Sequence, residues 1–249
     1  MKINFDGQEL EIDKNPDHLT LLGGKYYADK ATWHKYTHVY KKIFDHLGYT
    51  RDSPITFLEI GFSLGSSHLM WREYFPNATI IAIDIKQWRW YQEKLKWTDA
   101  STLESKAALL RNFDNLFDDK FQLFVGDQKD PSVLQEICDK FGEFDIILDD
   151  ASHKDYETMV SFKHLFPYLK NGSPYIIEDI GGGASETRME RVRHDIQLFN
   201  DSGKFNYLDH GGDVSSTSLI RMAYDLGLSE SKLPPLGNGA SDFGIIVKK

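Results

Sequence analysis

Short apolar runs alternate with helix-like segments along most of the chain. The runs that predict strands are residues 55–60, 79–84, 121–125, 144–148, 174–177 and 243–248. Apolar residues recur at helical spacing over about 65–75, 132–140 and 156–169. Strands that are apolar throughout and alternate with helices are typical of a parallel sheet buried on both faces. We therefore expect an α/β fold with a doubly wound, mostly parallel sheet.

Residues 1–50 precede this alternation and have a different pattern. Residues 3–12 predict a short hairpin around a tight turn. Residues 27–48 are rich in polar and aromatic side chains and predict one helix that ends at a glycine. We therefore divide the chain into a hairpin and helical extension over residues 1–50 and a main domain over residues 51–249.

Two stretches interrupt the alternation of strands and helices. Residues 85–120 are too long for one connecting helix, and we read them as an insertion. Four aromatic residues gather in it, namely Trp88, Trp90, Tyr91 and Trp97. Such rings either cover an acceptor as a lid or pack in a subunit interface, and the sequence favours neither. Residues 181–218 contain several glycines and predict mobile loops around a short helix.

Composition and charge indicate which kinds of binding partner the protein can have. The 249 residues carry 29 basic and 38 acidic side chains, a net charge of −9. Binding to nucleic acid or to an anionic membrane needs clustered cations, so we expect neither partner. The single cysteine, Cys138, excludes an intrachain disulfide and a cysteine-based zinc site. The sequence shows no signal peptide and no apolar run of membrane-spanning length, so we expect a cytoplasmic protein.

The strongest local motif follows the first strand of the main domain, where Glu59 precedes Gly61 and Gly65. Gly61 allows a ligand to approach the backbone closely, and Gly65 begins the next helix. A dinucleotide fingerprint would carry glycine in place of Ser63, and Glu59 would repel a phosphate. The motif therefore favours a cationic or zwitterionic ligand and disfavours a nicotinamide-dependent oxidoreductase. An ordinary strand-to-helix turn is the alternative.

Polar residues also follow the next two strands. Asp84 ends one strand at a position where a carboxylate can accept hydrogen bonds from ribose hydroxyls. Asp127 and Gln128 follow the next strand and can pair with an adenine edge. Each of these is also compatible with a simple strand-end turn. Together they predict one crevice at the carboxyl edge of the sheet.

Two further strands end in pairs of acids, Asp149-Asp150 and Glu178-Asp179. So many carboxylates at one edge would raise each other's pKa unless a cation lay among them. Three oxygens, from Asp150, Glu178 and Asp179, suit Mg²⁺. Asp149 points to the opposite face of its strand, so we place it on the cofactor side or on a backbone amide. The alternative is that these acids cap helices.

His153 follows Asp150 by three residues, at the start of a predicted helix. Histidine is the commonest general base, and His153 is the best candidate for that role in this chain. The alternative is a histidine that caps the helix or binds the metal.

Several of these motifs together resemble a known family. The succession of Glu59, Gly61, Gly65, Asp84, Asp127 and Gln128 resembles class I S-adenosylmethionine-dependent methyltransferases. More narrowly, the residues around the acidic strand ends, 148–153 and 177–180, resemble the metal-dependent sugar O-methyltransferases of macrolide biosynthesis, the mycinamicin type. An upstream segment also resembles that family through Tyr27, Asp29, Lys30, His34, Tyr36 and Tyr40. The insertion at 85–120 is longer than usual in the family, and Ala151 replaces a common glycine.

The resemblance implies a Rossmann-like sheet of seven strands and an S-adenosylmethionine- and Mg²⁺-dependent O-methyltransferase. The acceptor would be a hydroxyl of a small molecule, a sugar or another natural product. The metal ligands would be Asp150, Glu178 and Asp179, with His153 and Asp150 as catalytic residues. The cofactor residues would be Glu59, Gly61, Gly65, Asp84, Asp127, Gln128 and Asp149. We also expect a homo-oligomer.

Two other functions stay open from the sequence. The spacing of a metal acid, a base and further acids also resembles catechol O-methyltransferases, so a catechol or phenol is the second acceptor class. A scaffold subunit or a metal-assisted lyase on the same fold would bind the cofactor without methylating anything, because fold does not fix function.

Overall fold

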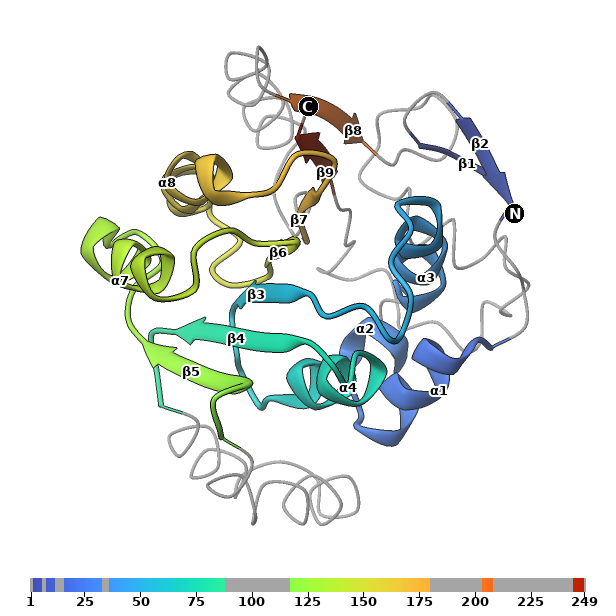
Figure 1. Cartoon of the computed structure of the whole chain (residues 1–249), viewed down its shortest axis with the longest axis horizontal. Helices are drawn as coiled ribbons and strands as arrows, with labels where there is room; N and C mark the ends of the chain where they lie inside the picture. Colours follow the sequence, from blue (N-terminus) through green and yellow to red (C-terminus); the bar gives the residue numbers. More distant parts are fainter. Residues whose placement is uncertain are drawn as a thin grey trace.

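The computed structural model describes residues 2–5, 8–11, 16–32, 36–87, 117–179, 203–207 and 244–248. Within these residues, seven strands form one sheet in the order β5-β4-β3-β6-β7-β9-β8 (Figure 1). Their bounds are β3 (Thr56–Ile60), β4 (Thr79–Asp84), β5 (Phe121–Val125), β6 (Ile146–Asp149), β7 (Pro174–Ile177), β8 (Gly203–Tyr207) and β9 (Gly244–Lys248). Strands β3 to β7 are parallel, and β9 runs antiparallel to both β7 and β8. The mostly parallel α/β sheet predicted from the sequence is thus confirmed.

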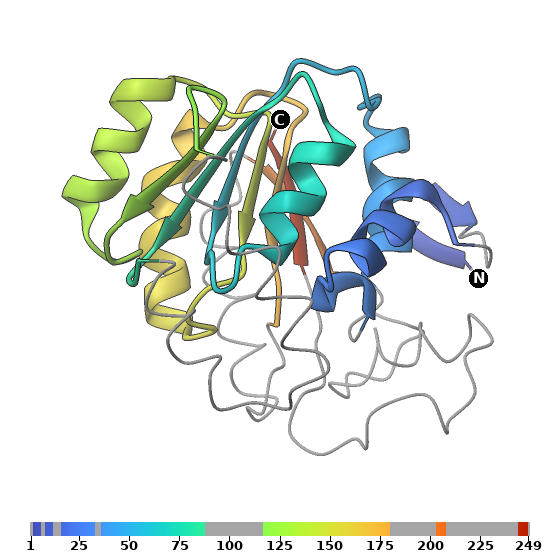
Figure 2. The ribbon, with the colours of Figure 1, turned by 90° about the horizontal axis from the view of Figure 1, so that it is seen from below.

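Helices cover both faces of the sheet (Figure 2). On one face lie α1 (His18–Lys25), α2 (Asp29–Thr32), α3 (Thr37–His46) and α4 (Ser66–Tyr74). On the other lie α7 (Pro131–Phe141), α8 (Asp155–Leu165) and the short 3₁₀ helix η2 (Phe166–Tyr168). A separate hairpin of β1 (Lys2–Phe5) and β2 (Gln8–Glu11) precedes them. Among the helices that the structure describes, none has both the length and the apolar character that a membrane crossing requires.

Two hydrophobic cores follow from the alternation of side chains along each strand. On β3, Phe57 packs into the core shared with α1, α3 and α4, where Trp71 and Phe44 are fully buried. The next residue, Leu58, packs on the opposite side into the core shared with α7 and α8. Helices α1 and α3 therefore share one core with the sheet. The domain boundary near residue 50 stays a prediction.

The structure corrects two sequence predictions and adds one helix. The segment 27–48 forms α2 and then α3 rather than one helix, and Tyr27 before it has φ 55°. The stretch 181–218, predicted as loops around a helix, contains the edge strand β8. Helix α1 lies in a stretch to which the sequence prediction assigned no element, and its paired glycines disfavour a helix. Gly23 is needed there, since a Cβ at this position would lie 2.2 Å from Cβ of Ala31. The insertion residues 88–116 lie outside the described residues.

Gly61, directly after β3, provides a test of the packing at the sheet edge. Its φ is 103°, and a Cβ there would lie 2.2 Å from the carbonyl oxygen of Asp150. We expect Gly61→Ala to lower the free energy of unfolding in urea by about 2–4 kcal/mol, from backbone strain plus overpacking. Gly48→Ala is the matched control, because Gly48 has φ 83° and open space around it. Equal losses in the two variants would show that the contact with Asp150 costs nothing.

Candidate active site

A pocket of about 330 Å³ opens at the carboxyl edge of the sheet, where β3 and β6 lie side by side. The strands β4 and β5 follow on one side of β3, whereas β7 follows on the other side, next to β6, so the strand order reverses between β3 and β6. Parallel sheets bind ligands at such a switch point. Of the predicted site residues, the ones that line the pocket are Gly61, Asp84, Asp127, Gln128, Asp150, His153 and Asp179. The predicted residues Glu59, Gly65, Asp149 and Glu178 lie outside this lining.

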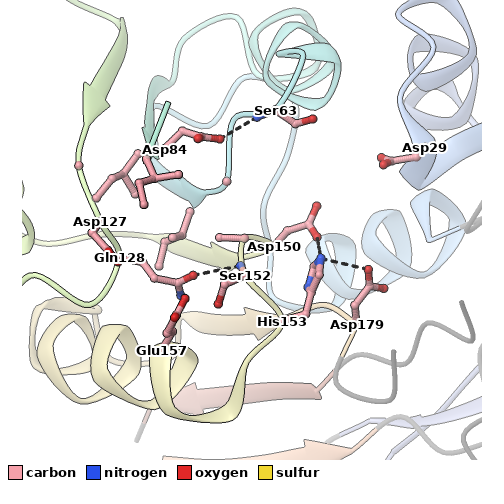
Figure 3. Close-up of a pocket in the computed structure, with 16 residues that line it drawn as sticks. Asp29, Ser63, Asp84, Asp127, Gln128, Asp150, Ser152, His153, Glu157 and Asp179 are labelled. Atoms are coloured by element: carbon pink, nitrogen blue, oxygen red, sulfur yellow. Dashed lines mark hydrogen bonds and ion pairs between the residues drawn. The ribbon is translucent and has the colours of Figure 1, made fainter. Parts of the chain in front are cut away.

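The glycine-containing loop is attached to the end of β4. The backbone N–H groups of Phe62 and Ser63 donate to Oδ2 of Asp84 at 2.8 and 2.9 Å, and Lys86 N–H donates to Oδ1 at 2.9 Å. Gly65 adopts φ 73° at the start of α4. Asp84 therefore fixes the loop in addition to facing the pocket (Figure 3).

Gln128 lines the pocket and is held from behind by Asp149. The Nε2 group of Gln128 donates to both carboxylate oxygens of Asp149 at 3.3 Å, and its Oε1 accepts from the Ser152 N–H at 3.0 Å. Ser161 donates to Asp149 Oδ2 at 2.6 Å. Burial raises the pKa of Asp149 to about 6. Asp149 thus acts on the pocket through Gln128, which agrees with its placement on the opposite face of β6.

Asp150, His153 and Asp179 meet at the other end of the pocket (Figure 3). His153 Nε2 lies 3.5 Å from Asp179 Oδ2 and 3.9 Å from Asp150 Oδ1. One ligand atom from each residue lies within 4.8 Å of the others, which is close enough for all three to hold one metal ion. Tyr36 donates to Asp179 Oδ1 at 3.0 Å. Two carboxylates and an imidazole suit a small divalent ion.

Three residues of the pocket adopt left-handed backbone conformations that favour glycine. They are Ser63, His153 and Asp179, with φ of 47°, 54° and 54°. Such conformations cost energy and persist where the surrounding structure imposes them, often at functional sites. Ser63 lies in the loop after β3, and His153 and Asp179 lie beside each other at the opposite end of the pocket.

A buried lysine lies behind the acidic end. Glu59, Asp150 and Glu178 project from the same face of β3, β6 and β7, because side chains on a strand alternate between faces. Nζ of Lys30, from α2, lies 3.3 Å from Glu59 Oε1 and donates to Glu178 Oε2 at 2.9 Å. It also donates to Asp150 Oδ2, and Tyr40 donates to Glu178 Oε1.

Charge and burial oppose each other in this cluster. Burial disfavours the ammonium of Lys30, but the carboxylates of Asp150, Glu178 and Glu59 outweigh it and hold its pKa well above the usual value. Burial and the neighbouring Asp150 raise the pKa of Glu178 well above the ordinary value, although Lys30 opposes the rise. Burial also raises the pKa of Glu59 to about 7.

Glu59 was predicted at the cofactor, and the structure places it inside the protein instead. It is fully buried and accepts hydrogen bonds from the Ser67 hydroxyl at 2.9 Å and the Trp71 indole at 3.0 Å. Strand alternation turns Glu59 toward α4, and Glu59 pairs with Leu148, two residues before Asp150, so it lies deeper in the sheet than the pocket. Glu59 is linked to the site through Lys30, which contacts both Glu59 and Asp150.

Comparison in sequence identifies relatives with named activities. The chain is 30% identical over 190 residues to the 8-demethyl-8-(2-methoxy-alpha-L-rhamnosyl)-tetracenomycin-C 3'-O-methyltransferase of Streptomyces olivaceus, across 70% of this chain and 42% of that protein. It is also 30% identical over 171 residues to the L-olivosyl-oleandolide 3-O-methyltransferase of Streptomyces antibioticus, across 65% and 36%. The chain is a relative of the macrolide and sugar O-methyltransferases.

This methyltransferase relative spans about two fifths of the length of the curated proteins that it matches. No family model matches it. In fold it resembles the MycE methyltransferase from the mycinamycin biosynthetic pathway, solved with Mg and SAH, with a TM-score of 0.57, 22% identity and coverage of 94% of this chain and 55% of that one. It also resembles an O-methyltransferase from Bacillus cereus, with a TM-score of 0.53, 16% identity and coverage of 93% and 90%. The class I methyltransferase fold is thus confirmed.

Several residues that line the pocket were not predicted from the sequence. Asp29, Ser152 and Glu157 line the pocket but were not proposed as site residues. Lys30 was noted only as part of a motif, without a role. Its signal is weak: Lys30 stands between Asp29 and Ala31, and only the neighbouring alanines, Ala28 and Ala31, indicate a buried turn. His34, from the same motif, lies outside the described residues.

Proposed function

We propose that the protein is an S-adenosylmethionine- and Mg²⁺-dependent O-methyltransferase that methylates a hydroxyl of a sugar or another natural product. One observation carries the proposal: a single pocket at the switch point joins the end with Asp84 and Gln128 to the end with Asp150, His153 and Asp179. The relatives support the acceptor class, because their names describe O-methylation of sugar-bearing natural products.

The end with Asp84, Asp127 and Gln128 suits the adenosine part of the cofactor. The Asp84 carboxylate accepts hydrogen bonds from the loop N–H groups of Phe62 and Ser63, and it would also accept hydrogen bonds from ribose hydroxyls. Gln128 is held in one orientation by Asp149 and Ser152, so it can present a fixed polar edge to adenine. The solved MycE and Bacillus cereus proteins contain SAH, which supports the same cofactor for this chain.

The other end has a donor set that fits Mg²⁺. Asp150 and Asp179 offer oxygen ligands, and the solved MycE structure contains Mg. Mg²⁺ held there would lower the pKa of an acceptor hydroxyl by several units. His153 is partly exposed to the pocket and would accept the proton of that hydroxyl, with Asp179 holding the imidazole in place. Glu178, which the sequence also proposed as a ligand, is 2% exposed, and both of its oxygens accept from protein donors.

Asp84→Ala tests the cofactor end. We expect binding of S-adenosylmethionine to weaken by about tenfold or more, or about 1.4 kcal/mol, because ribose hydrogen bonds are lost and the loop is released. Isothermal calorimetry measures this, and Asp52→Ala at an exposed turn is the control. Unchanged affinity for S-adenosylmethionine would show that Asp84 does not bind the cofactor. Tight binding of NAD by the wild-type protein would contradict the methyltransferase proposal and favour a dinucleotide-dependent enzyme.

A catechol or phenol acceptor remains the second candidate, since the same metal end would also hold two neighbouring phenolic oxygens. A scaffold or lyase would bind the cofactor and leave every acceptor unmethylated. The homo-oligomer and the cytoplasmic location also stay predictions, and the gel-filtration profile of the purified protein tests the first of them.

A further inference from the structure

Lys30 is a buried cation among the acids at this end of the pocket. It is 1% exposed, although lysine is almost never fully buried unless it is paired. An ammonium has three donors, and three carboxylates surround this one: Glu59, Asp150 and Glu178. These acids come from three neighbouring strands, while Lys30 comes from α2 in the N-terminal segment.

Lys30 contacts one oxygen of Asp150 and one oxygen of Glu178, and the other oxygen of Asp150 is left facing the pocket. Lys30 engages Oδ2 of Asp150, and Oδ1 of the same carboxylate faces His153 at 3.9 Å. Glu178 is occupied on both oxygens, by Lys30 at 2.9 Å and by Tyr40. Lys30 therefore turns one oxygen of Asp150 toward the pocket and keeps Glu178 behind it.

We propose that Lys30 is the positioning residue of the metal end, the end of the pocket with Asp150, His153 and Asp179: its ammonium orients Asp150 toward a divalent ion and holds Glu178 behind the ligands. This inference rests on the proposed function, because it needs a divalent ion at Asp150 and Asp179. It makes α2, α3 and Tyr36 before α3 part of the site, since Lys30 and Tyr40 both donate to Glu178 and Tyr36 donates to Asp179.

The expected cost of losing Lys30 follows from its contact with a ligand. Hydrogen-bond partners of metal ligands typically change metal affinity by about 10–100-fold when they are removed. Breaking a buried ion pair also destabilises the fold strongly, because it leaves the partner charge unpaired. A charge-balanced variant is therefore needed beside the single one.

The experiment measures Mn²⁺ binding by electron paramagnetic resonance and SAH binding by calorimetry, on the full chain. The variants are Lys30→Met, which removes the charge, Lys30→Arg, which keeps it, and Lys30→Met with Glu59→Gln, which leaves the net charge unchanged. Glu59→Gln alone is the reference for the double variant. Lys25→Met is the matched control, because Lys25 is an exposed lysine that pairs with Glu73.

We expect Lys30→Met and the double variant to bind Mn²⁺ about 10–100-fold more weakly with SAH affinity unchanged, and Lys30→Arg to recover part of the loss. If Lys30→Met unfolds, the double variant decides. Mn²⁺ binding that is unchanged or tighter would overturn the inference and show that Lys30 is only a structural counter-ion or a competitor of the metal. A wild-type protein that binds SAH but no Mn²⁺ would instead overturn the metal in the proposed function, and this inference with it.

Discussion

Replacing His153 with asparagine is expected to lower kcat by on the order of 10²–10⁴-fold while binding of S-adenosylmethionine is retained. The acceptor hydroxyl must lose its proton, and His153 is the imidazole that lines the described pocket beside Asp150 and Asp179. Asparagine is preferred to alanine because His153 has φ 54°, a conformation that asparagine tolerates. Steady-state kinetics and cofactor calorimetry on one preparation separate the two effects.

His18→Asn, on the exposed start of α1, is the control for loss of a histidine far from the reaction. If kcat of the His153 variant stays near the wild-type value, another group or bulk water takes the proton. If cofactor affinity falls together with kcat, His153 supports the shape of the pocket instead.

Removing divalent ions with EDTA is expected to reduce turnover by on the order of 10³-fold or more, and added Mg²⁺ is expected to restore it. The reason is that the hydroxyl of a sugar is a poor nucleophile, and the described chain brings the carboxylates of Asp150 and Asp179 together beside His153. Activity assays over a range of free Mg²⁺ measure the effect directly.

Two acids of the same pocket provide the matched comparison. Asp179→Asn should raise the Mg²⁺ concentration needed for half-maximal activity, while Asp127→Asn, at the cofactor end, should leave it unchanged. Full turnover by the chelated enzyme would contradict the metal mechanism and return Asp150 and Asp179 to a structural role.

The main sheet was predictable because its strands are short, apolar and separated by amphipathic helices. The edge strand β8 was not, since its stability comes from antiparallel pairing with β9, far away in the sequence. The break between α2 and α3 was also missed. In the structure the Tyr36 N–H donates to the Lys30 carbonyl at 2.7 Å across that break, a contact that helical periodicity does not predict.

The sequence predicted that the site lies at the strand ends. It did not predict that some of the acids line the pocket while Glu59 and Glu178 lie behind it with Lys30. Alternation along the strand correctly separated Asp149 from Asp150, but it places Glu59 and Glu178 on the same face as Asp150, so it did not predict that these two lie outside the pocket lining. The partner of these acids, Lys30, is distant in sequence and comes from a segment that the strand pattern does not connect to the sheet. Its role depends on tertiary packing.

The most direct test of the proposed activity is transfer of a radiolabelled methyl group from S-adenosylmethionine. The purified chain is incubated with Mg²⁺ and a panel of sugar-bearing natural products, catechols and simple alcohols, and products are resolved by mass spectrometry. We predict label on a hydroxyl oxygen of a sugar-bearing acceptor, lost on addition of EDTA. Absence of label from every hydroxyl acceptor, in a preparation that binds S-adenosylmethionine by calorimetry, would contradict the account.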